Sequence, residues 1–166
     1  NQLNEIGIKS EFIKGLRVTD KKTIKVVEEV LIEFNKKIIE ALKKQACNSQ
    51  TINSKENNII TVIQENVDLG FVGTPTKINK SIIDKIVDDK KVPVIAPLGL
   101  DTSNQTYNIN ADTAAGSIAK KIEARRLIIM SDVEGVLDSN KKLIPEIDSQ
   151  SIKDLINNET VTGGML

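Results

Sequence analysis

The longest regular pattern in the chain is an apolar repeat at three- and four-residue spacing across residues 21–44. Such spacing gathers apolar side chains on one face of a helix, and Thr19 and Asp20, which precede the repeat, are residue types that cap helix N-termini. Further apolar residues widen this face, which predicts either deep burial or contact with another subunit. The repeating positions are Ile24, Val27, Leu31, Phe34, Ile38 and Leu42.

Shorter apolar runs follow the predicted helix. A β-branched run at 59–63 predicts a strand, and the glycine-bounded segment 67–72 predicts a second, short extended piece. Apolar residues in helical spacing across 78–87 predict an amphipathic helix. The run at 92–97 predicts another strand, with Pro93 at its start or on an edge of the sheet.

The final elements of the pattern are a strand, a helix and a strand in succession. Helix-forming residues cover 113–124, and the apolar run at 127–130 has the composition of a strand that is covered on both faces. A helix between two such strands imposes parallel pairing and a right-handed crossover, and ligands bind such sheets at the carboxyl ends of the strands. Polar motifs follow both strands in this chain, so the pattern predicts an α/β fold with a site at that edge.

The length and charge of the chain limit the classes of function. Its 166 residues suit a single domain with a substantial core. Lys and Arg number 23, as do Asp and Glu, and aromatic residues make up 2% of the chain. This balance argues against nucleic acid as a partner, because it provides neither a basic surface nor stacking side chains. No apolar stretch reaches the roughly 20 residues that span a bilayer, so no membrane association is expected.

The chain contains no histidine and one cysteine, Cys47. These counts exclude a Cys/His zinc site and His-based catalytic triads within these residues, and a single thiol fits a reducing, cytoplasmic setting. Phosphoryl transfer is compatible with this composition, because it relies mainly on positioning and electrostatic stabilisation. A carboxylate acceptor is already ionised at neutral pH and needs no base.

The densest candidate chemistry lies between Tyr107 and Gly116. Asn108, Asn110 and Asp112 stand at the start of a run of small helix-forming residues. A helix N-terminus attracts anions through its free N–H groups and its dipole, so a phosphate or carboxylate is a suitable ligand there. Asp112 has two interpretations: it caps the helix, or it orients cations that bind the anion in turn.

A second candidate is Arg17, in the segment Gly-Leu-Arg-Val-Thr at 15–19. Its planar guanidinium can hold a carboxylate through two parallel hydrogen bonds. A lone Arg is more often a solvated or salt-bridged surface residue, so the pattern by itself leaves both roles open.

Three motifs together resemble the N-acetylglutamate kinases of the amino acid kinase family. They are the segment 15–19, the Asn-Ile-Asn-Ala-Asp-Thr-Ala-Ala-Gly segment at 108–116 after a Pro-Val-Ile-Ala-Pro strand, and Ser-Asp-Val-Glu-Gly-Val-Leu-Asp at 131–138. The resemblance covers nearly the whole chain. It implies a three-layer αβα sandwich with a mainly parallel central sheet, incomplete at both ends, as one partial domain over 1–166.

The resemblance also implies roles for individual residues. Arg17 would hold the α-carboxylate of the substrate, Asn108 would contact the acetylamino acid, and Asp112 would orient the catalytic lysines. No metal ligand is implied, because Mg²⁺ would be held mainly by the phosphates of ATP. The adenine nucleotide would be bound by Asp132, Val133, Glu134, Gly135, Val136 and Leu137, with further contacts from Thr160, Val161 and Thr162.

The reaction implied by this resemblance is ATP-dependent phosphorylation of the side-chain carboxylate of N-acetyl-L-glutamate, in arginine biosynthesis. A homo-oligomer, either a dimer or a trimer of dimers, is implied as well. One alternative is a related kinase for acetylaminoadipate, since discrimination by one methylene is worth only about 1 to 3 kcal/mol. A second alternative is a catalytically silent homologue that binds a ligand and acts through protein contacts.

Some features of the family pattern are not found in the chain. The first catalytic lysine and a pair of glycines are expected before Asn1, and a second lysine after Leu166, so the 166 residues alone are expected to be inactive. The segment Asn-Ser-Lys-Glu-Asn-Asn at 53–58 stands where the family tends to have a glycine-rich turn. Asn tolerates positive φ better than Ser does, which leaves the conformation of this loop open.

Overall fold

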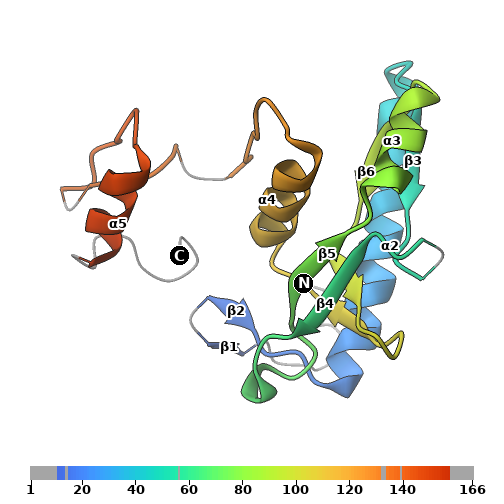
Figure 1. The fold of residues 1–166 in the computed structure, drawn as a ribbon, viewed down its shortest axis with the longest axis horizontal. Helices are drawn as coiled ribbons and strands as arrows, with labels where there is room; N and C mark the ends of the chain where they lie inside the picture. Colours follow the sequence, from blue (N-terminus) through green and yellow to red (C-terminus); the bar gives the residue numbers. More distant parts are fainter. Residues whose placement is uncertain (1–10, 14, 56, 132–133, 139, 158–166) are drawn as a thin grey trace.

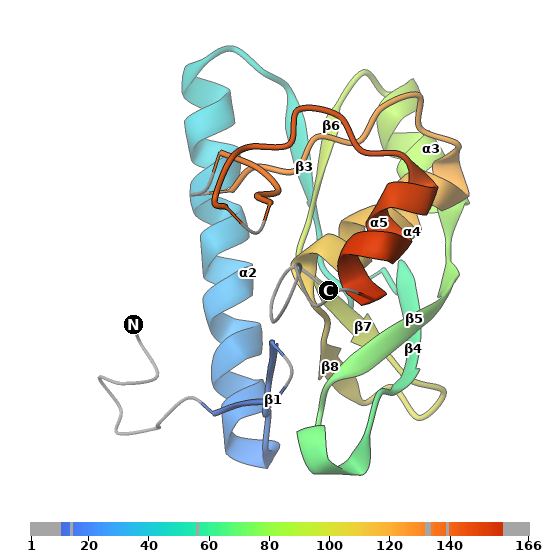
Figure 2. The same ribbon diagram turned by 90° about the vertical axis from the view of Figure 1, so that its left-hand side faces the viewer.

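The computed structural model describes residues 11–13, 15–55, 57–131, 134–138 and 140–157. Helix α2 packs against one side of the strands, and α3 and α4 lie on the other side (Figures 1 and 2). This arrangement agrees with the predicted αβα layers. The elements are β1 (Phe12–Ile13), β2 (Leu16–Arg17), α2 (Lys21–Lys44), β3 (Ser49–Ile52), β4 (Ile60–Gln64), η1 (Val67–Leu69), β5 (Gly73–Ile78), α3 (Lys80–Asp88), β6 (Val92–Ile95), β7 (Leu98–Leu100), β8 (Thr106–Asn108), α4 (Ala111–Ile122) and α5 (Ser149–Asn157).

Helix α2 has the bounds that the apolar repeat predicts. Asp20 is its N-cap, and the carboxylate oxygen Oδ1 accepts hydrogen bonds from the backbone N–H groups of Lys22 at 3.0 Å and Thr23 at 2.7 Å. The Thr23 hydrogen bonds are the main reason that the pKa of Asp20 lies below its ordinary value. The predicted start of the helix is therefore confirmed, and its capping residue is Asp20 rather than Thr19.

The described strands form one mixed sheet and two separate pairs, of which β1 and β2 are antiparallel. A four-stranded sheet has the order β5-β4-β7-β8, in which β4 and β7 are parallel and the other two pairs are antiparallel. Strands β3 and β6 form a separate parallel pair. The α/β class is confirmed, although antiparallel pairing is more extensive here than a mainly parallel sheet implies.

The prediction of an extended piece over 67–72 is wrong for its first half. Val67–Leu69 is a 3₁₀ helix, η1, because the side chain of Asn66 accepts a hydrogen bond from the N–H of Asp68 and turns the chain. Only the residues after η1 are extended, and Val72 forms an isolated parallel bridge with Asn108.

The other predicted elements near the middle of the chain agree with the structure to within a few residues. Strand β4 and helix α3 occupy the predicted regions, except that Ile78 ends β5 instead of opening the helix. Pro93 is the second residue of β6, and among the described residues β6 pairs with β3 alone. The expectation that Pro93 lies near a strand start or on an edge is confirmed.

The segment 127–130 differs from its prediction as a doubly covered strand. It forms no strand within the described residues, and its side chains are exposed, Met130 to 93%. An apolar run becomes a buried strand only when neighbouring strands and helices cover it, and no described element does so here. The strand, helix and strand unit is therefore not closed in the described part of the chain.

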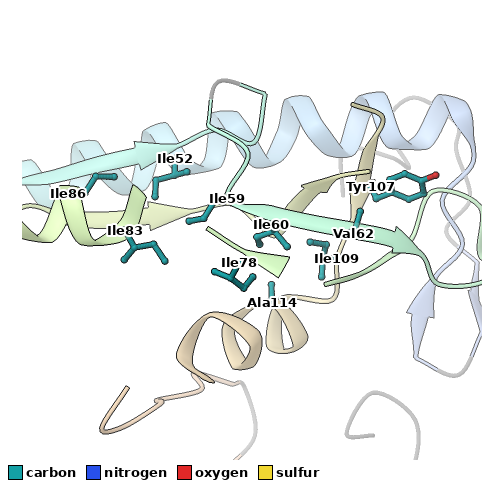
Figure 3. Close-up of a cluster of buried hydrophobic side chains, with 10 residues drawn as sticks. All are labelled: Ile52, Ile59, Ile60, Val62, Ile78, Ile83, Ile86, Tyr107, Ile109 and Ala114. Carbon is teal, nitrogen blue, oxygen red and sulfur yellow. The ribbon is translucent and has the colours of Figure 1, made fainter. Parts of the chain in front are cut away.

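The core lies between the strands and the helices α3 and α4. Figure 3 shows its side chains converging from β4, from the ends of β3 and β5, and from the two helices. Each such side chain that is removed from water stabilises the fold by roughly 1.5 to 3 kcal/mol. The buried cluster consists of Ile52, Ile59, Ile60, Val62, Ile78, Ile83, Ile86, Tyr107, Ile109 and Ala114.

Helix α2 is attached to the strands by buried polar contacts as well as by apolar ones. The Asn35 side chain donates hydrogen bonds to Thr51 Oγ1 at 3.2 Å and to the Val94 carbonyl at 3.1 Å. Because these two acceptors belong to β3 and β6, Asn35 fixes the helix to both strands of the parallel pair. Asn35 itself is only 5% exposed, so the donor side of this link is buried.

The loop at 53–58 has an ordinary backbone in its described residues. The Asn53 side chain accepts from the N–H of Lys55 at 3.1 Å, and the Asn53 carbonyl accepts from the N–H of Asn57 at 2.8 Å. None of its described residues has a positive φ. The described residues of this loop, with Asn and Ser where the family tends to have glycine, thus adopt no left-handed backbone conformation. The Lys55 ammonium also contacts Glu28 of α2 at 2.9 Å.

None of the helices in the described part of the chain is both long and apolar enough to cross a membrane.

Candidate functional site

Arg17 lies on the second strand of a short hairpin, as the predicted extended segment requires. Phe12 is opposite Arg17 in the β1–β2 pair, and Gly15 adopts φ 80° before β2, which favours glycine. The guanidinium carbon of Arg17 lies 4.7 Å from the centre of the Phe12 ring, within the range of a cation–π contact. The half-buried side chain is thereby held against the hairpin.

Thr19 joins the Arg17 hairpin to the segment after η1. Its hydroxyl donates to the Arg17 carbonyl at 3.0 Å, and its N–H donates to the Leu69 carbonyl at 2.9 Å. In return the Thr19 carbonyl accepts from the N–H of Phe71 at 2.7 Å. Gly70 lies between these two bonds with φ 67°, and a Cβ there would be 2.4 Å from the Thr19 carbonyl oxygen. The close approach of the two segments therefore depends on glycine at this position.

Asn108 lies on the opposite side of the same segment. Its N–H donates to the Phe71 carbonyl at 2.9 Å, and the ring of Phe71 packs on Tyr107 with centroids 5.7 Å apart. Burial raises the pKa of Tyr107, and the neighbouring Asp101 carboxylate raises it further. Tyr107 is thus a buried side chain that packs directly beside Asn108.

These hydrogen bonds place Arg17 and Asn108 in one structural unit. The segment through Thr19, the segment 70–72 and the end of β8 lie side by side as extended chain. The bridges Thr19–Gly70 and Val72–Asn108 thus join the two segments that carry the predicted substrate-binding residues through the single segment 70–72.

Asp112 follows Asn108 at the start of α4, but it does not cap the helix. The N-cap is Asn110, whose Oδ1 accepts from the N–H groups of Asp112 and Thr113, each at 3.0 Å. Asp112 is the second residue of the helix and is exposed, and its carboxylate makes no hydrogen bond or ion pair among the described residues. The capping interpretation of Asp112 is wrong, and its carboxylate is available to bind a cation near the helix N-terminus.

The predicted nucleotide site is described only in part. Asp132, Val133, Thr160, Val161 and Thr162 lie outside the described residues. The remaining residues, 134–137, belong to a small turn in which Leu137 forms an antiparallel bridge with Leu143. Gly135 has φ 147° within this turn.

The structure does not bring the 134–137 turn to the Arg17 and Asn108 unit. The turn and α5 stand apart from the strands that carry these residues (Figure 1). None of the α5 side chains is buried. The described residues therefore join the segments that carry the predicted substrate-binding residues, and they do not bring the described part of the predicted nucleotide site to them.

Two clefts in the described part of the chain lie around α4. An apolar groove of about 360 Å³ runs between β6 and α4, from Ala111 to Leu127. A second cleft of about 510 Å³ lies between β5 and the C-terminal half of α4 and is lined by three lysines, Lys77, Lys120 and Lys121. This basic cleft was not predicted from the sequence, although Lys120 and Lys121 are adjacent at the end of a predicted helix.

Comparison with known proteins agrees with this geometry. The sequence model of the amino acid kinase family matches residues 1–166, and the chain belongs to this family. A crystal structure from Streptococcus mutans UA159, of smu.665, superposes with a TM-score of 0.91 at 30% sequence identity, over 99% of this chain and 67% of that one. An N-acetylglutamate synthase structure from Neisseria gonorrhoeae superposes with a TM-score of 0.78 over 93% of this chain and 36% of that one; at 19% identity it shows a shared fold.

Among curated relatives, the chain is 65% identical over its whole length to a protein of Pelagibacter ubique named acetylglutamate kinase. It is 40% identical over 99% of its length to a protein of the same name from Methylobacterium nodulans. The chain spans 58% and 59% of these two relatives.

Proposed function

We propose that the complete protein that contains this chain phosphorylates the side-chain carboxylate of N-acetyl-L-glutamate with ATP, as a step of arginine biosynthesis. The observation that carries this proposal is the 65% identity, over the whole chain, to a relative named acetylglutamate kinase. At that level of identity the residues that contact a substrate are commonly shared, and the motifs around Arg17, Asn108 and Asp112 are among those that resemble this class.

The substrate would lie across the joined segments that carry Arg17 and Asn108. The guanidinium of Arg17 can hold one carboxylate through paired hydrogen bonds, and the Asn108 amide can both donate to and accept from an acetylamino group. The other carboxylate of the substrate is the nucleophile. One of its oxygens attacks the γ-phosphorus of ATP in line, the bond to the β-γ bridging oxygen breaks, and ADP leaves.

Asp112 would act on the transferring phosphoryl group indirectly. Its carboxylate is exposed at the start of α4, where it can orient lysine ammonium groups from the rest of the complete protein. Ammonium groups in such a position stabilise the negative charge of the phosphoryl group in the transition state. In this proposal Asp112 is a positioning residue.

The nucleotide would be held by the 132–137 turn and by Thr160, Val161 and Thr162. Gly135, with its φ of 147°, provides a backbone without a side chain that a nucleotide can approach closely. In the described part of the chain, no cluster of three or more Asp, Glu, Cys or His residues could hold a metal ion. From the family resemblance we expect Mg²⁺ to be held mainly by the ATP phosphates, where it would supply charge neutralisation.

The proposal includes a cytoplasmic homo-oligomer. Helix α2 supports it, because Phe34 on its surface is 57% exposed and could be covered by a second copy. A sedimentation measurement on the complete protein tests this part of the proposal. A mass equal to that of one chain at micromolar concentration would refute it.

The test of the activity is hydroxylamine trapping of the acyl phosphate formed by the complete protein with MgATP. N-acetylglutamate, N-acetylaminoadipate and free glutamate are compared as acceptors. Asp112→Asn is expected to lower the rate by about 100-fold or more, as for loss of a preorganised electrostatic group. Asp84→Asn is the matched control, because Asp84 is also an exposed helical carboxylate but pairs with Lys80 at 2.6 Å on α3.

The outcomes separate the candidate functions. Trapping that depends on N-acetylglutamate, is lost in Asp112→Asn and is kept in Asp84→Asn supports the proposal. A preference for N-acetylaminoadipate would assign the related kinase activity instead. Ligand binding without turnover would indicate a silent homologue.

A further inference from the structure

The cleft between β5 and α4 lies at the end of α4 that is opposite Asp112. Lys120 is eight residues after Asp112, which corresponds to about 12 Å along the helix axis. The volume of about 510 Å³ is within the range of small-molecule sites. This cleft shares no lining residue with the Arg17 and Asn108 unit. Its lining residues are Pro75, Thr76, Lys77, Ile78, Ser117, Lys120, Lys121 and Glu123.

Positive charge is concentrated in this cleft, although the chain as a whole is neutral. Lys77, Lys120 and Lys121 line it with one carboxylate, that of Glu123. None of these three ammonium groups has an ion pair or hydrogen bond among the described residues. Four described lysines outside the cleft form ion pairs with Asp or Glu, namely Lys37, Lys55, Lys80 and Lys91, whereas others such as Lys43 and Lys44 form none within the described part of the chain. The cleft is distinguished by three such unpaired lysines that line it together. The cleft thus gathers cationic groups that the described residues do not neutralise.

The favourable effect of basic residues at a helix C-terminus explains only part of this arrangement. Lys120 and Lys121 occupy the last turn of α4, as Lys43 and Lys44 occupy the last turn of α2, and both pairs complement the helix dipole. Lys77, however, comes from β5 and faces the same cleft. Convergence of charge from two elements is what distinguishes the α4 pair from the α2 pair.

The hydroxyl groups of the cleft are also suited to an anion. The hydroxyl of Ser117, on α4, has no hydrogen-bond partner among the described residues, so it can donate to an anion. The Thr76 hydroxyl, in contrast, donates to the Thr61 carbonyl at 3.1 Å and is already used. Phosphate and carboxylate oxygens accept from both ammonium and hydroxyl donors.

We propose that this cleft binds a small organic anion with at least two negative charges, either a phosphorylated compound or a polycarboxylate, at a site separate from that of the phosphoryl transfer. Two or more charges are required because the net charge of the lining side chains is two positive, from three ammonium groups and one carboxylate. The binding is expected to weaken with salt, because the lysines are exposed.

Calorimetric titration of the complete protein tests the proposal, with pyrophosphate, inorganic phosphate and glutarate as probes at constant ionic strength. Lys120→Gln with Lys121→Gln is expected to weaken binding of the preferred probe by about tenfold, at roughly threefold for each exposed charge. Lys43→Gln with Lys44→Gln is the matched control and is expected to leave binding unchanged. Thermal unfolding of each variant confirms that it folds.

The probes distinguish the chemical source of the anion. Tighter binding of pyrophosphate than of glutarate would assign a phosphorylated ligand, and the reverse order would assign a polycarboxylate. Equal weakening by the α2 and α4 pairs would show a general charge effect and overturn the proposal. The absence of saturable binding of any probe at millimolar concentration would overturn it as well, as would binding that neither pair of substitutions alters.

Discussion

Substitution of Gly70 by alanine tests whether the two segments that bear Arg17 and Asn108 depend on a close backbone approach. Gly70 has φ 67°, which L residues adopt rarely, and a Cβ would lie 2.4 Å from the Thr19 carbonyl oxygen. That oxygen is also the acceptor of the Phe71 N–H at 2.7 Å. The side chain can be accommodated only if the Thr19 and Phe71 segments move apart.

The expected loss of stability follows from two contributions. A non-glycine residue in a sparsely populated backbone region costs about 1 to 3 kcal/mol. Weakening of the hydrogen bond between Phe71 and Thr19 adds about 1 kcal/mol. Gly70→Ala should therefore lower the free energy of unfolding by roughly 2 to 4 kcal/mol, and it should raise the KM for the acetylamino acid because Arg17 moves relative to Asn108.

Urea denaturation followed by circular dichroism measures the first effect, and Gly116→Ala provides a control of opposite sign. Gly116 lies within α4, and a Cβ there would meet no atom within 4 Å. Alanine at a helix interior is favoured over glycine by about 0.5 to 1 kcal/mol, so this variant should be more stable than the parent. If Gly70→Ala unfolds at the same urea concentration as the parent, the inferred close approach of the two segments is refuted.

Two further predictions concern helix α2. Asn35→Leu leaves Thr51 Oγ1 and the Val94 carbonyl without this donor, so it should lower the free energy of unfolding by about 1 to 3 kcal/mol. As a control, Lys37→Gln removes an exposed ion pair with Glu33 and should change the free energy of unfolding by less than about 1 kcal/mol. Denaturation midpoints that rank these variants the other way would contradict the buried link. The lowered pKa of Asp20 means that its charge stabilises the fold above its ordinary value of 3.8 and ceases to do so as the pH falls through the folded-state value. The parent should therefore be more stable than Asp20→Asn near about pH 6 and lose this advantage toward about pH 2, and a difference that grows on acidification would show that the sign is wrong.

The helices could be predicted from the sequence because their signals are local. The bounds of α2 follow from its apolar repeat and from Asp20, α3 follows from similar spacing, and α4 follows from its run of small helix-forming residues. At α4 the sequence offered Asp112 as a cap, and the structure shows that Asn110 accepts the two N–H groups instead. Local spacing determines that a helix begins there, but it does not select between neighbouring polar side chains.

The short strands could not be predicted in the same way. Strands β3 and β8 are Ser-Gln-Thr-Ile and Thr-Tyr-Asn, which have little apolar alternation, and their pairing depends on residues far away in the chain. The segment 127–130 shows the reverse error, because its apolar composition suggested burial that the described residues do not provide. In the candidate site, Arg17 and Asn108 were identified by resemblance. Their link through Thr19 and Phe71 consists of hydrogen bonds between segments far apart in the chain, so it could not be predicted from the sequence.

The exposed apolar run at 127–130 also has a consequence for self-association. Leu-Ile-Ile-Met has high β-propensity and contains no proline, so it is a short template for strand addition between molecules. Its flanks carry opposite charges, Arg125 and Arg126 before it and Asp132 after it. In a parallel, in-register stack these like charges would lie above one another and repel, whereas antiparallel pairing would set arginine against aspartate. The charge order therefore acts as a gatekeeper against amyloid-type stacking while leaving antiparallel pairing of two copies open.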